Sequence, residues 1–356
     1  MTWKQCLYLV FVLTIVYQFE MPSQMLRTSA SRQCSEEAPN MTAAPATSVG
    51  EIRIVKPAAV AVADLVTGSP AQTECPSGVA TIKEWYGRFG NNVNQVLHAL
   101  HYAVHHNLCR VTLPTGWHQQ YRNDETLFLA DEINVTSTCC SANDKNRSIL
   151  DLFFEYHKML NKTEHSHIPL PTLDVMRELA QQYIVPILTI NLKRVLPRGP
   201  DEIGMHVRSG DMFARNPHPL YVPVPLYFYV EVLKNYSKST VVYEDAQSPL
   251  VAEMKKMPKM NLKTYATFEK VLLVLSSFQN LAFGFGTFGT MAFYLSPNIK
   301  RLYVPDYFVP LMPVGSDRSS HVTAVSLPGY IPVLTWHNTK QQRWFMLHYT
   351  PPSIVK

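Results

Sequence analysis

The chain has 356 residues; 46% of them are hydrophobic and 17% are charged, and the formal net charge at pH 7 is +5. This length and hydrophobic content suit a globular protein with one large core or two domains of ordinary size. The mild positive charge suits phosphate ligands, but its size and the lack of Lys and Arg runs exclude a strongly basic nucleic-acid-binding protein.

The first predicted element is an apolar segment, CLYLVFVLTIVYQF, over residues 6–19, which Lys4 precedes. As a helix it would span about 21 Å, less than the roughly 30 Å hydrocarbon core of a bilayer. Two interpretations stay open: the apolar region of a cleaved signal peptide, and a short uncleaved anchor with a positive cytoplasmic flank. No clear small-residue cleavage site follows, so the prediction for residues 1–20 is a single-pass type II signal anchor in a thin early-secretory membrane.

Either interpretation places the remaining chain in the lumen of the secretory pathway. Five Asn-x-Ser/Thr sequons agree with this location; they begin at Asn40, Asn134, Asn146, Asn161 and Asn235. Residues 21–76 are rich in Ala, Ser, Thr, Pro and Glu, with no sustained apolar period. This composition is typical of a flexible stem between an anchor and a folded part.

Five cysteines follow the apolar segment, namely Cys34, Cys75, Cys109, Cys139 and Cys140. In an oxidising compartment an odd number predicts one or two disulfides and one free thiol. Because adjacent cysteines do not easily bridge each other, we expect Cys139 or Cys140 to pair with Cys109 or Cys75. No Cys-x-x-Cys motif is present, so a structural zinc site is not expected.

The N-terminal domain, predicted over residues 77–200, opens with a strand, a glycine loop, a helix and a strand. The sequence places them at residues 79–85, 86–92, 92–106 and 109–114, with apolar side chains at helical spacing in the third segment. This succession is a βαβ unit, so the sheet is expected to be parallel here. A further helix is expected to stop before Pro186.

The C-terminal domain, predicted over residues 201–356, alternates strands and helices. Strands are expected at residues 202–208, 239–245, 280–285 and 301–305. Helices are expected at residues 226–236, 249–257, 267–278 with Thr267 as N-cap, and 290–296. The alternation predicts an α/β fold with a second parallel sheet.

Ligands of open α/β sheets bind at the carboxyl ends of strands, and two candidate loops lie at such ends. Residues 87–92 combine glycines and Arg88 with a helix N-terminus, which favours an anion; the alternative is a plain glycine turn with Asn91 as N-cap. Residues 206–211 place His206 and Arg208 on one strand face; the alternative is an ion pair between Arg208 and Asp211.

The third candidate loop is FGFGTFG, residues 283–289, which matches the dinucleotide fingerprint G-x-G-x-x-G, with Asp306 at about the expected spacing. Three features argue against NAD or FAD: only about 50 residues follow Asp306, the next helix is short and ends at Pro297, and the first loop is a better-placed phosphate site. We expect the loop to hold the pyrophosphate of a sugar nucleotide; the alternative is a glycine-rich packing turn.

The segments GRFGNNVNQVLHALHYA, MHVRSGD and GTFG, in this order, resemble the inverting fucosyltransferase superfamily. The first is similar to the GRFGNQ segment and following helix of protein O-fucosyltransferases, and the second to the HVRRGD of α1,2-fucosyltransferases. The third stands where the family has a Ser-Ser-Phe type loop. The resemblance covers roughly residues 75–310, and the departures at Asn92 and Ser209 leave the acceptor subfamily open.

The resemblance implies two Rossmann-like domains with GDP-fucose in the cleft between them, behind an anchor and a stem. It implies these site residues: Arg88, Phe89, Gly90 and Asn91 lining the donor cleft, His206 on the nucleotide, Arg208 on the bridging oxygen and β-phosphate, Asp245 at the guanine or ribose, and Thr287 and Phe288 at the pyrophosphate.

The departing GDP carries negative charge, which many sugar-nucleotide transferases neutralise with a metal on an Asp-x-Asp motif. No such motif occurs in this chain, so Arg208 and helix-end N–H groups are expected to take that role, with no metal and no cofactor beyond the donor. The acceptor is expected to be a glycan or glycoprotein hydroxyl, and Asp211 and Glu244 are open candidates for its base. The rival interpretations are a non-catalytic nucleotide-sugar- or glycan-binding secretory protein and an NAD-type oxidoreductase.

Overall fold

The computed structural model describes residues 78–114, 130–135, 147–150, 168–219, 221–311, 321–330 and 336–352. Two compact units divide the chain, Met1–Ala58 and Ala59–Lys356, and every described residue belongs to the second. The predicted anchor and stem lie outside the described residues. Within the part that is described, no helix has the length and apolar character needed to cross a membrane.

The first sheet has four strands in the order β3-β2-β1-β4. Their bounds are Val79–Ile82 for β1, Arg110–Thr112 for β2, Glu132–Asn134 for β3 and Arg147–Leu150 for β4. Strand β1 is parallel to both β2 and β4, whereas β2 and β3 are antiparallel. The helix α4, Phe89–His105, connects β1 to β2, which confirms the predicted parallel βαβ unit.

The second sheet has six strands, all parallel, in the order β10-β9-β8-β5-β6-β7. Their bounds are Glu202–Val207 for β5, Lys238–Tyr243 for β6, Met260–Lys263 for β7, Asn280–Phe283 for β8, Arg301–Pro305 for β9 and Val322–Val325 for β10. Counted within this sheet, the order is that of a doubly wound, Rossmann-like fold. The order reverses between β5 and β8, which is where such sheets bind ligands.

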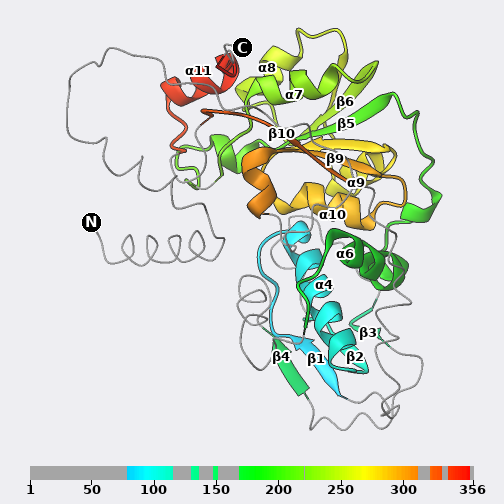
Figure 1. Cartoon of the computed structure of the whole chain (residues 1–356). Coiled ribbons are helices and arrows are strands. Elements are labelled where there is room, and N and C mark those ends of the chain that lie inside the picture. The colour runs from blue at the N-terminus through cyan, green and yellow to red at the C-terminus, as the bar shows by residue number, and fades with distance from the viewer. Residues whose placement is uncertain are drawn as a thin grey trace, which may run out of the picture. The chain divides into compact units, whose positions relative to one another are not determined.

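Helices cover both faces of the second sheet (Figure 1). On one face Leu281 and Phe283 of β8 join a core cluster with α9, Phe268–Ser276, and α10, Thr287–Leu295. On the other face Ala282 joins a cluster with three helices; these are α7, Leu226–Leu233, α8, Pro249–Met254, and α11, Lys340–His348. This alternation along β8 is the pattern of a central strand buried on both faces.

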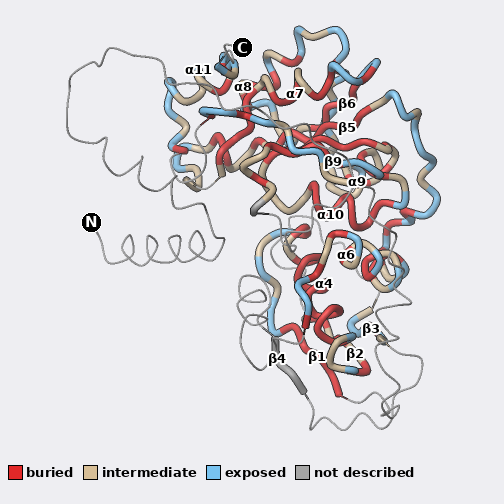
Figure 2. The backbone as a smooth tube through the Cα atoms, viewed as in Figure 1, coloured by how far each residue is buried: buried red, intermediate tan, exposed pale blue. Residues whose placement is uncertain are grey.

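The cluster that contains α10 continues into the first sheet. It includes side chains of α4, of β1 and β2, and of α6, Leu173–Leu179. Helix α10 packs directly against α4 and α6, and red, buried segments are seen in α10, α4 and β1 (Figure 2). The α-helical part of α6 ends at Leu179 and passes into a wider helical turn, Ala180–Ile184, and then a tighter one, Val185–Ile187, so helical turns continue through Pro186 although the helix was predicted to stop before it.

Two predicted helix starts were wrong, and α7 and α8 each end three residues earlier than predicted. Helix α4 begins at Phe89 rather than at residue 92, and α10 begins at Thr287 rather than at residue 290. The glycines that indicated loops are helix residues at close contacts: a Cβ on Gly90 would lie 2.8 Å from Thr287 Oγ1, and one on Gly289 would overlap the Phe283 ring. Packing between distant elements therefore outweighs the low helix propensity of glycine.

Candidate functional site

The candidate site lies at the carboxyl edge of the second sheet, where the strand order reverses. Strand β5 ends at Val207, immediately before Arg208, and β8 ends at Phe283, immediately before the glycine turn 284–286. Since β5 and β8 are hydrogen-bonded parallel neighbours, these two segments leave the sheet side by side. The loop that precedes α4 reaches the same place, because α4 packs on α10.

Arg208 is held in one orientation by Asp211. Its Nε and Nη2 atoms donate to the two carboxylate oxygens of Asp211 at 3.2 and 2.6 Å, so the ion pair expected as the alternative for this loop is present. The guanidinium also lies over the ring of Tyr221, 4.2 Å from its centroid, and the side chain is only 17% exposed. Burial, the largest single effect, lowers the pKa of Arg208, but Asp211, Tyr221 and Glu244 together raise it above its ordinary value, so the side chain remains a cation.

The remaining guanidinium nitrogen of Arg208 faces the turn before α10. A Cβ on Gly286 would lie 2.9 Å from Nη1, so only a glycine leaves room for this approach. Gly286 also has φ 120° and ψ 162°, a backbone region that is open essentially to glycine alone. Arg208 thus presents one edge to Asp211 and Nη1 to the amino end of α10.

A second arginine and a second carboxylate complete a cluster of four charged side chains, Arg88, Arg208, Asp211 and Glu244. The Nη2 atom of Arg88 lies 3.6 Å from Asp211 Oδ2, and its Nη1 atom lies 3.8 Å from Glu244 Oε1. The Arg88 side chain is 61% exposed, so these weaker ion pairs leave it accessible to a ligand. With two cations and two carboxylates, the cluster is balanced in charge without a ligand.

The amino ends of α4 and α10 meet beside this cluster. The N-cap residues are Arg88 and Gly286, and neither of them caps its helix with a side-chain hydrogen bond. The Thr287 hydroxyl donates to Asn91 Oδ1 at 2.6 Å, and Gly90 lets the two helices approach at the same point. The partial positive charges of both helix ends are therefore directed to one region, where an anion is favoured.

His206 is the penultimate residue of β5 and lies two residues before Arg208 in the chain. It is buried, with 7% of its surface exposed, and its ring stacks on Phe288 with centroids 4.9 Å apart and an interplanar angle of 29°. Burial, with a further contribution from the charge of Arg208, lowers the pKa of His206 to about 4. The imidazole is therefore neutral at physiological pH and can offer one donor or one acceptor to a ligand.

This depressed pKa predicts a loss of stability in mild acid. An unfolded histidine binds a proton near pH 6.5 and the folded His206 only near 4. Between these values the unfolded state binds more protons, so the free energy of unfolding should fall by about 3 kcal/mol as pH drops from 6.5 to 4. Denaturant titrations of the wild type and His206→Gln at several pH values measure the difference, and NMR titration gives the pKa directly. If the free energy of unfolding changes equally with pH in both proteins, the prediction is wrong.

Phe89 and Asp245 differ from the other predicted site residues in their surroundings. Phe89 is buried, and its ring packs on Phe268 with centroids 5.0 Å apart. The Asp245 carboxylate accepts from the Gln247 N–H at 2.8 Å and so caps its own turn, while the Asp245 N–H donates to Ser209 Oγ at 2.9 Å. The other predicted residues, Arg88, Gly90, Asn91, His206, Arg208, Thr287 and Phe288, are brought together around the two helix ends.

Sequence reasoning missed an aromatic group that surrounds Arg208. Tyr221 lies under the guanidinium, and its ring is 5.4 Å from Phe285 and 4.6 Å from His218 between centroids. Phe285 belongs to the glycine turn before α10, so the group joins the two loops at the sheet edge. No local pattern around Tyr221 points to this contact, because the chain returns to Arg208 through a loop without regular period.

The fingerprint in residues 283–289 has part of the geometry of a dinucleotide site. It follows β8 and opens α10, and Gly289 lets the helix pack on Phe283. The acid that should bind a ribose is engaged, however: Asp306 accepts from the Tyr307 N–H at 2.9 Å and from the Leu327 N–H at 3.2 Å. This carboxylate holds the chain after β9.

The described residues include one cysteine, Cys109, and two buried histidines of α4. Cys109 is disulfide-bonded, and its partner lies outside the described residues. His98 and His101 of α4 are buried. Among the residues that the structure describes, no three His, Cys, Asp or Glu side chains form a group that could hold a metal ion.

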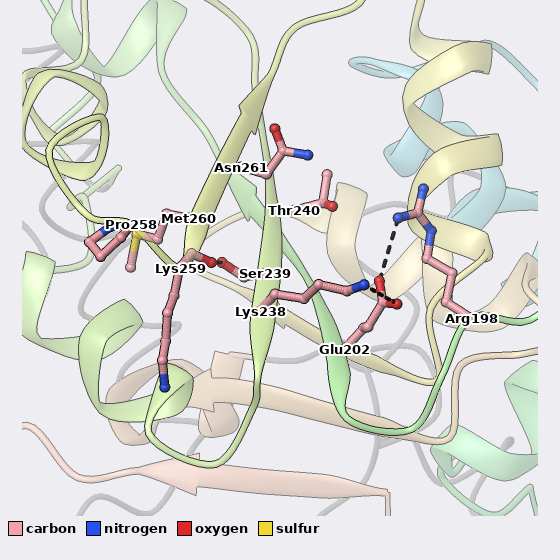
Figure 3. Close-up of a pocket in the computed structure, with 9 residues that line it drawn as sticks. All are labelled: Arg198, Glu202, Lys238, Ser239, Thr240, Pro258, Lys259, Met260 and Asn261. Carbon is pink, nitrogen blue, oxygen red and sulfur yellow. Dashed lines mark hydrogen bonds and ion pairs between the residues drawn. The ribbon is translucent and has the colours of Figure 1, made fainter.

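A surface cavity of about 460 Å³ lies at the opposite, amino edge of the sheet, around the first residues of β5, β6 and β7. Arg198 and Lys238 converge there on Glu202, at 3.6 and 2.9 Å (Figure 3). Glu202 pairs with both cations, and the amino edge is not where such sheets bind ligands. We therefore locate the candidate site at the carboxyl edge.

Comparison with other proteins adds no assignment to this geometry. No protein-family model matches the chain, and no curated protein is significantly similar to it. The fold itself defines the class as a parallel α/β protein with a doubly wound sheet.

Proposed function

We propose that the chain is an inverting, metal-independent glycosyltransferase that moves fucose from GDP-fucose to a glycan or protein hydroxyl. The observation that carries this proposal is the convergence of Arg208, Arg88 and the amino ends of α4 and α10 at the reversal of strand order. Such a set of donors suits a diphosphate. The choice of GDP-fucose rests on the resemblance of the three motifs to the fucosyltransferase superfamily.

In this proposal the diphosphate binds between the Nη1 atom of Arg208 and the amino end of α10. Arg208 faces that end across Gly286, and Asp211 fixes its orientation without occupying Nη1. The neutral imidazole of His206 and the exposed Arg88 lie around the same place and would contact the donor. The two sheets would then be the two Rossmann-like domains, residues 77–200 and 201–356, with the donor between them.

The proposed chemistry depends on charge that develops on the leaving group. When the bond from the anomeric carbon to the β-phosphate oxygen breaks, the electron pair leaves with GDP. A guanidinium and N–H dipoles that are already aimed at this oxygen stabilise the charge without reorganising. This is the role that a metal ion has in many other sugar-nucleotide transferases.

The proposed location is the lumen of the Golgi apparatus or the endoplasmic reticulum, with residues 1–20 as a type II anchor and residues 21–76 as a stem. The disulfide at Cys109 supports an oxidising compartment. The sequons at Asn134 and Asn235 fall at the end of β3 and between α7 and β6, and those at residues 40, 146 and 161 lie outside the described residues.

Isothermal titration calorimetry with GDP, GDP-fucose and NAD tests the proposal against its rivals. We expect binding of both guanine ligands without added metal, in the micromolar range or tighter, and no heat with NAD. Slow GDP-fucose hydrolysis should accompany binding if the chain is an enzyme, whereas a non-catalytic binding protein would leave the donor intact. Binding of NAD with no response to GDP would overturn the proposal.

A further inference from the structure

We propose that Glu244 is the catalytic base that removes the proton from the acceptor hydroxyl. This inference rests on the proposed function and assigns a residue for the second half of the same reaction. The inference rests on the positions of three neighbouring strand ends and on the exposure of Glu244. It rests also on a difference in ion pairing, because Asp211 pairs closely with Arg208 whereas Glu244 does not.

The strand order separates Glu244 from the proposed leaving-group side. The glycine turn before α10 follows β8, Arg208 follows β5, and Glu244 follows β6, and β5 lies between the other two strands. Neighbouring strands are about 4.8 Å apart, so the ends of β8 and β6 lie roughly 10 Å apart. An inverting displacement needs the base and the leaving group on opposite sides of the reacting carbon, with room for the nucleophile between.

The two carboxylates of the cluster differ in what they contact. Asp211 gives both oxygens to Arg208, at 3.2 and 2.6 Å, and therefore orients the arginine. Among the described residues Glu244 makes one long ion pair, 3.8 Å from Arg88, and its side chain is 34% exposed, so an incoming hydroxyl can reach it. The backbone N–H of Ser209 donates a hydrogen bond to the Glu244 carboxylate. The lack of a side chain at Gly210 leaves room beside the Glu244 carboxylate, because a Cβ at this position would lie 3.0 Å from Glu244 Oε2.

The charges around Glu244 give it a basicity that suits the role. Burial raises its pKa above the ordinary value, Arg88 and Arg208 lower it, and Asp211 raises it again, with a net upward shift. A bound diphosphate would pair with Arg88 and Arg208 and so weaken their effect on Glu244, and it would also add negative charge nearby. Both changes shift the pKa of Glu244 further upward. A base whose pKa lies nearer the working pH transfers protons more effectively.

In the proposed step, proton transfer to Glu244 accompanies the displacement at the anomeric carbon. The O–H bond of the acceptor breaks, and its proton passes to Glu244. The acceptor oxygen bonds to the anomeric carbon while the bond from that carbon to the β-phosphate oxygen breaks, and the electron pair leaves with GDP. The product complex therefore contains a protonated Glu244 and a GDP that carries one more negative charge than GDP-fucose did.

The variant Glu244→Gln tests this assignment through rate, affinity and proton count. We expect turnover of GDP-fucose to fall about 100-fold or more, with the Kd for GDP within about threefold of the wild-type value. The wild-type rate should fall as pH drops through the pKa of Glu244, and the variant should lack this acidic limb. Calorimetry in two buffers of different ionisation enthalpy should show proton uptake when GDP binds the wild type and less uptake in the variant. The comparison cancels the ionisation of GDP itself.

Two further variants complete the design. Glu253→Gln removes an exposed carboxylate of α8, which pairs only with Lys256 among the described residues, and should leave turnover and proton uptake unchanged. Glu244→Asp should fold and retain the acidic limb at a lower rate, which covers the case of an unstable glutamine variant.

Three outcomes would overturn the assignment. Turnover by Glu244→Gln within threefold of wild type would exclude Glu244 as the base. A parallel loss of GDP affinity would show that Glu244 binds the donor instead. If wild-type protein binds no GDP, the proposed function fails, and this inference fails with it; intact wild-type binding with either of the first two results overturns the base alone.

Discussion

Replacement of Arg208 by alanine should reduce GDP-fucose turnover by about 100- to 1,000-fold, the usual effect of removing one aligned donor to a developing negative charge. The affinity for GDP should fall much less, because Arg88 and the amino ends of α4 and α10 remain. The rate loss exceeds the affinity loss because the charge on the leaving oxygen is largest in the transition state. Single-turnover donor hydrolysis and GDP calorimetry measure the two effects separately.

Two comparison variants sharpen this experiment. Arg198→Ala removes an arginine at the opposite edge of the sheet, where it pairs with Glu202 at 3.6 Å, and should leave turnover unchanged. Arg208→Lys keeps the charge but loses the two-pronged pairing with Asp211, so its rate should lie between those of the wild type and the alanine variant. If Arg208→Ala keeps the wild-type rate, Arg208 does not stabilise the leaving group.

Buried central strands explain why the second sheet was predictable from the sequence. Strands β5 and β8 are buried along nearly their whole length, so each is a short, mostly apolar run between turn signals. The peripheral strands β7 and β10 are partly exposed and carry mixed residues, and neither was predicted. The short strand β3 and helix α11 were missed for the same lack of a clear apolar pattern.

The site was predictable only where its signal is local. Arg208 and Asp211 are three residues apart in one loop, and their pairing was an open alternative in the sequence. The contacts of Arg88 with Asp211 and Glu244 join residues that are far apart in the chain, so no local sequence pattern predicts them. The same holds for the Thr287–Asn91 hydrogen bond, which brings the two helix ends together.

The second large expected effect concerns Gly286, whose backbone and neighbours both require a glycine. An alanine at φ 120° and ψ 162° carries a strain of about 1–3 kcal/mol, so the free energy of unfolding should fall by that amount. Its methyl group would stand 2.9 Å from Arg208 Nη1 and displace the nitrogen from the amino end of α10. Turnover of GDP-fucose should therefore fall about 100-fold, as when one donor to the leaving group is lost.

A second glycine in the chain separates backbone strain from displacement of the arginine. Gly329 also has positive φ, 74°, but a Cβ there would have no atom within 4 Å. Gly329→Ala should lower the midpoint of thermal unfolding and leave turnover of the folded protein at the wild-type level. Gly286→Ala should lower both, and the double variant Gly286→Ala/Arg208→Ala should be no slower than Arg208→Ala alone, because both changes remove the same donor. Additive losses in the double variant would mean that Gly286 acts on turnover by a route other than Arg208.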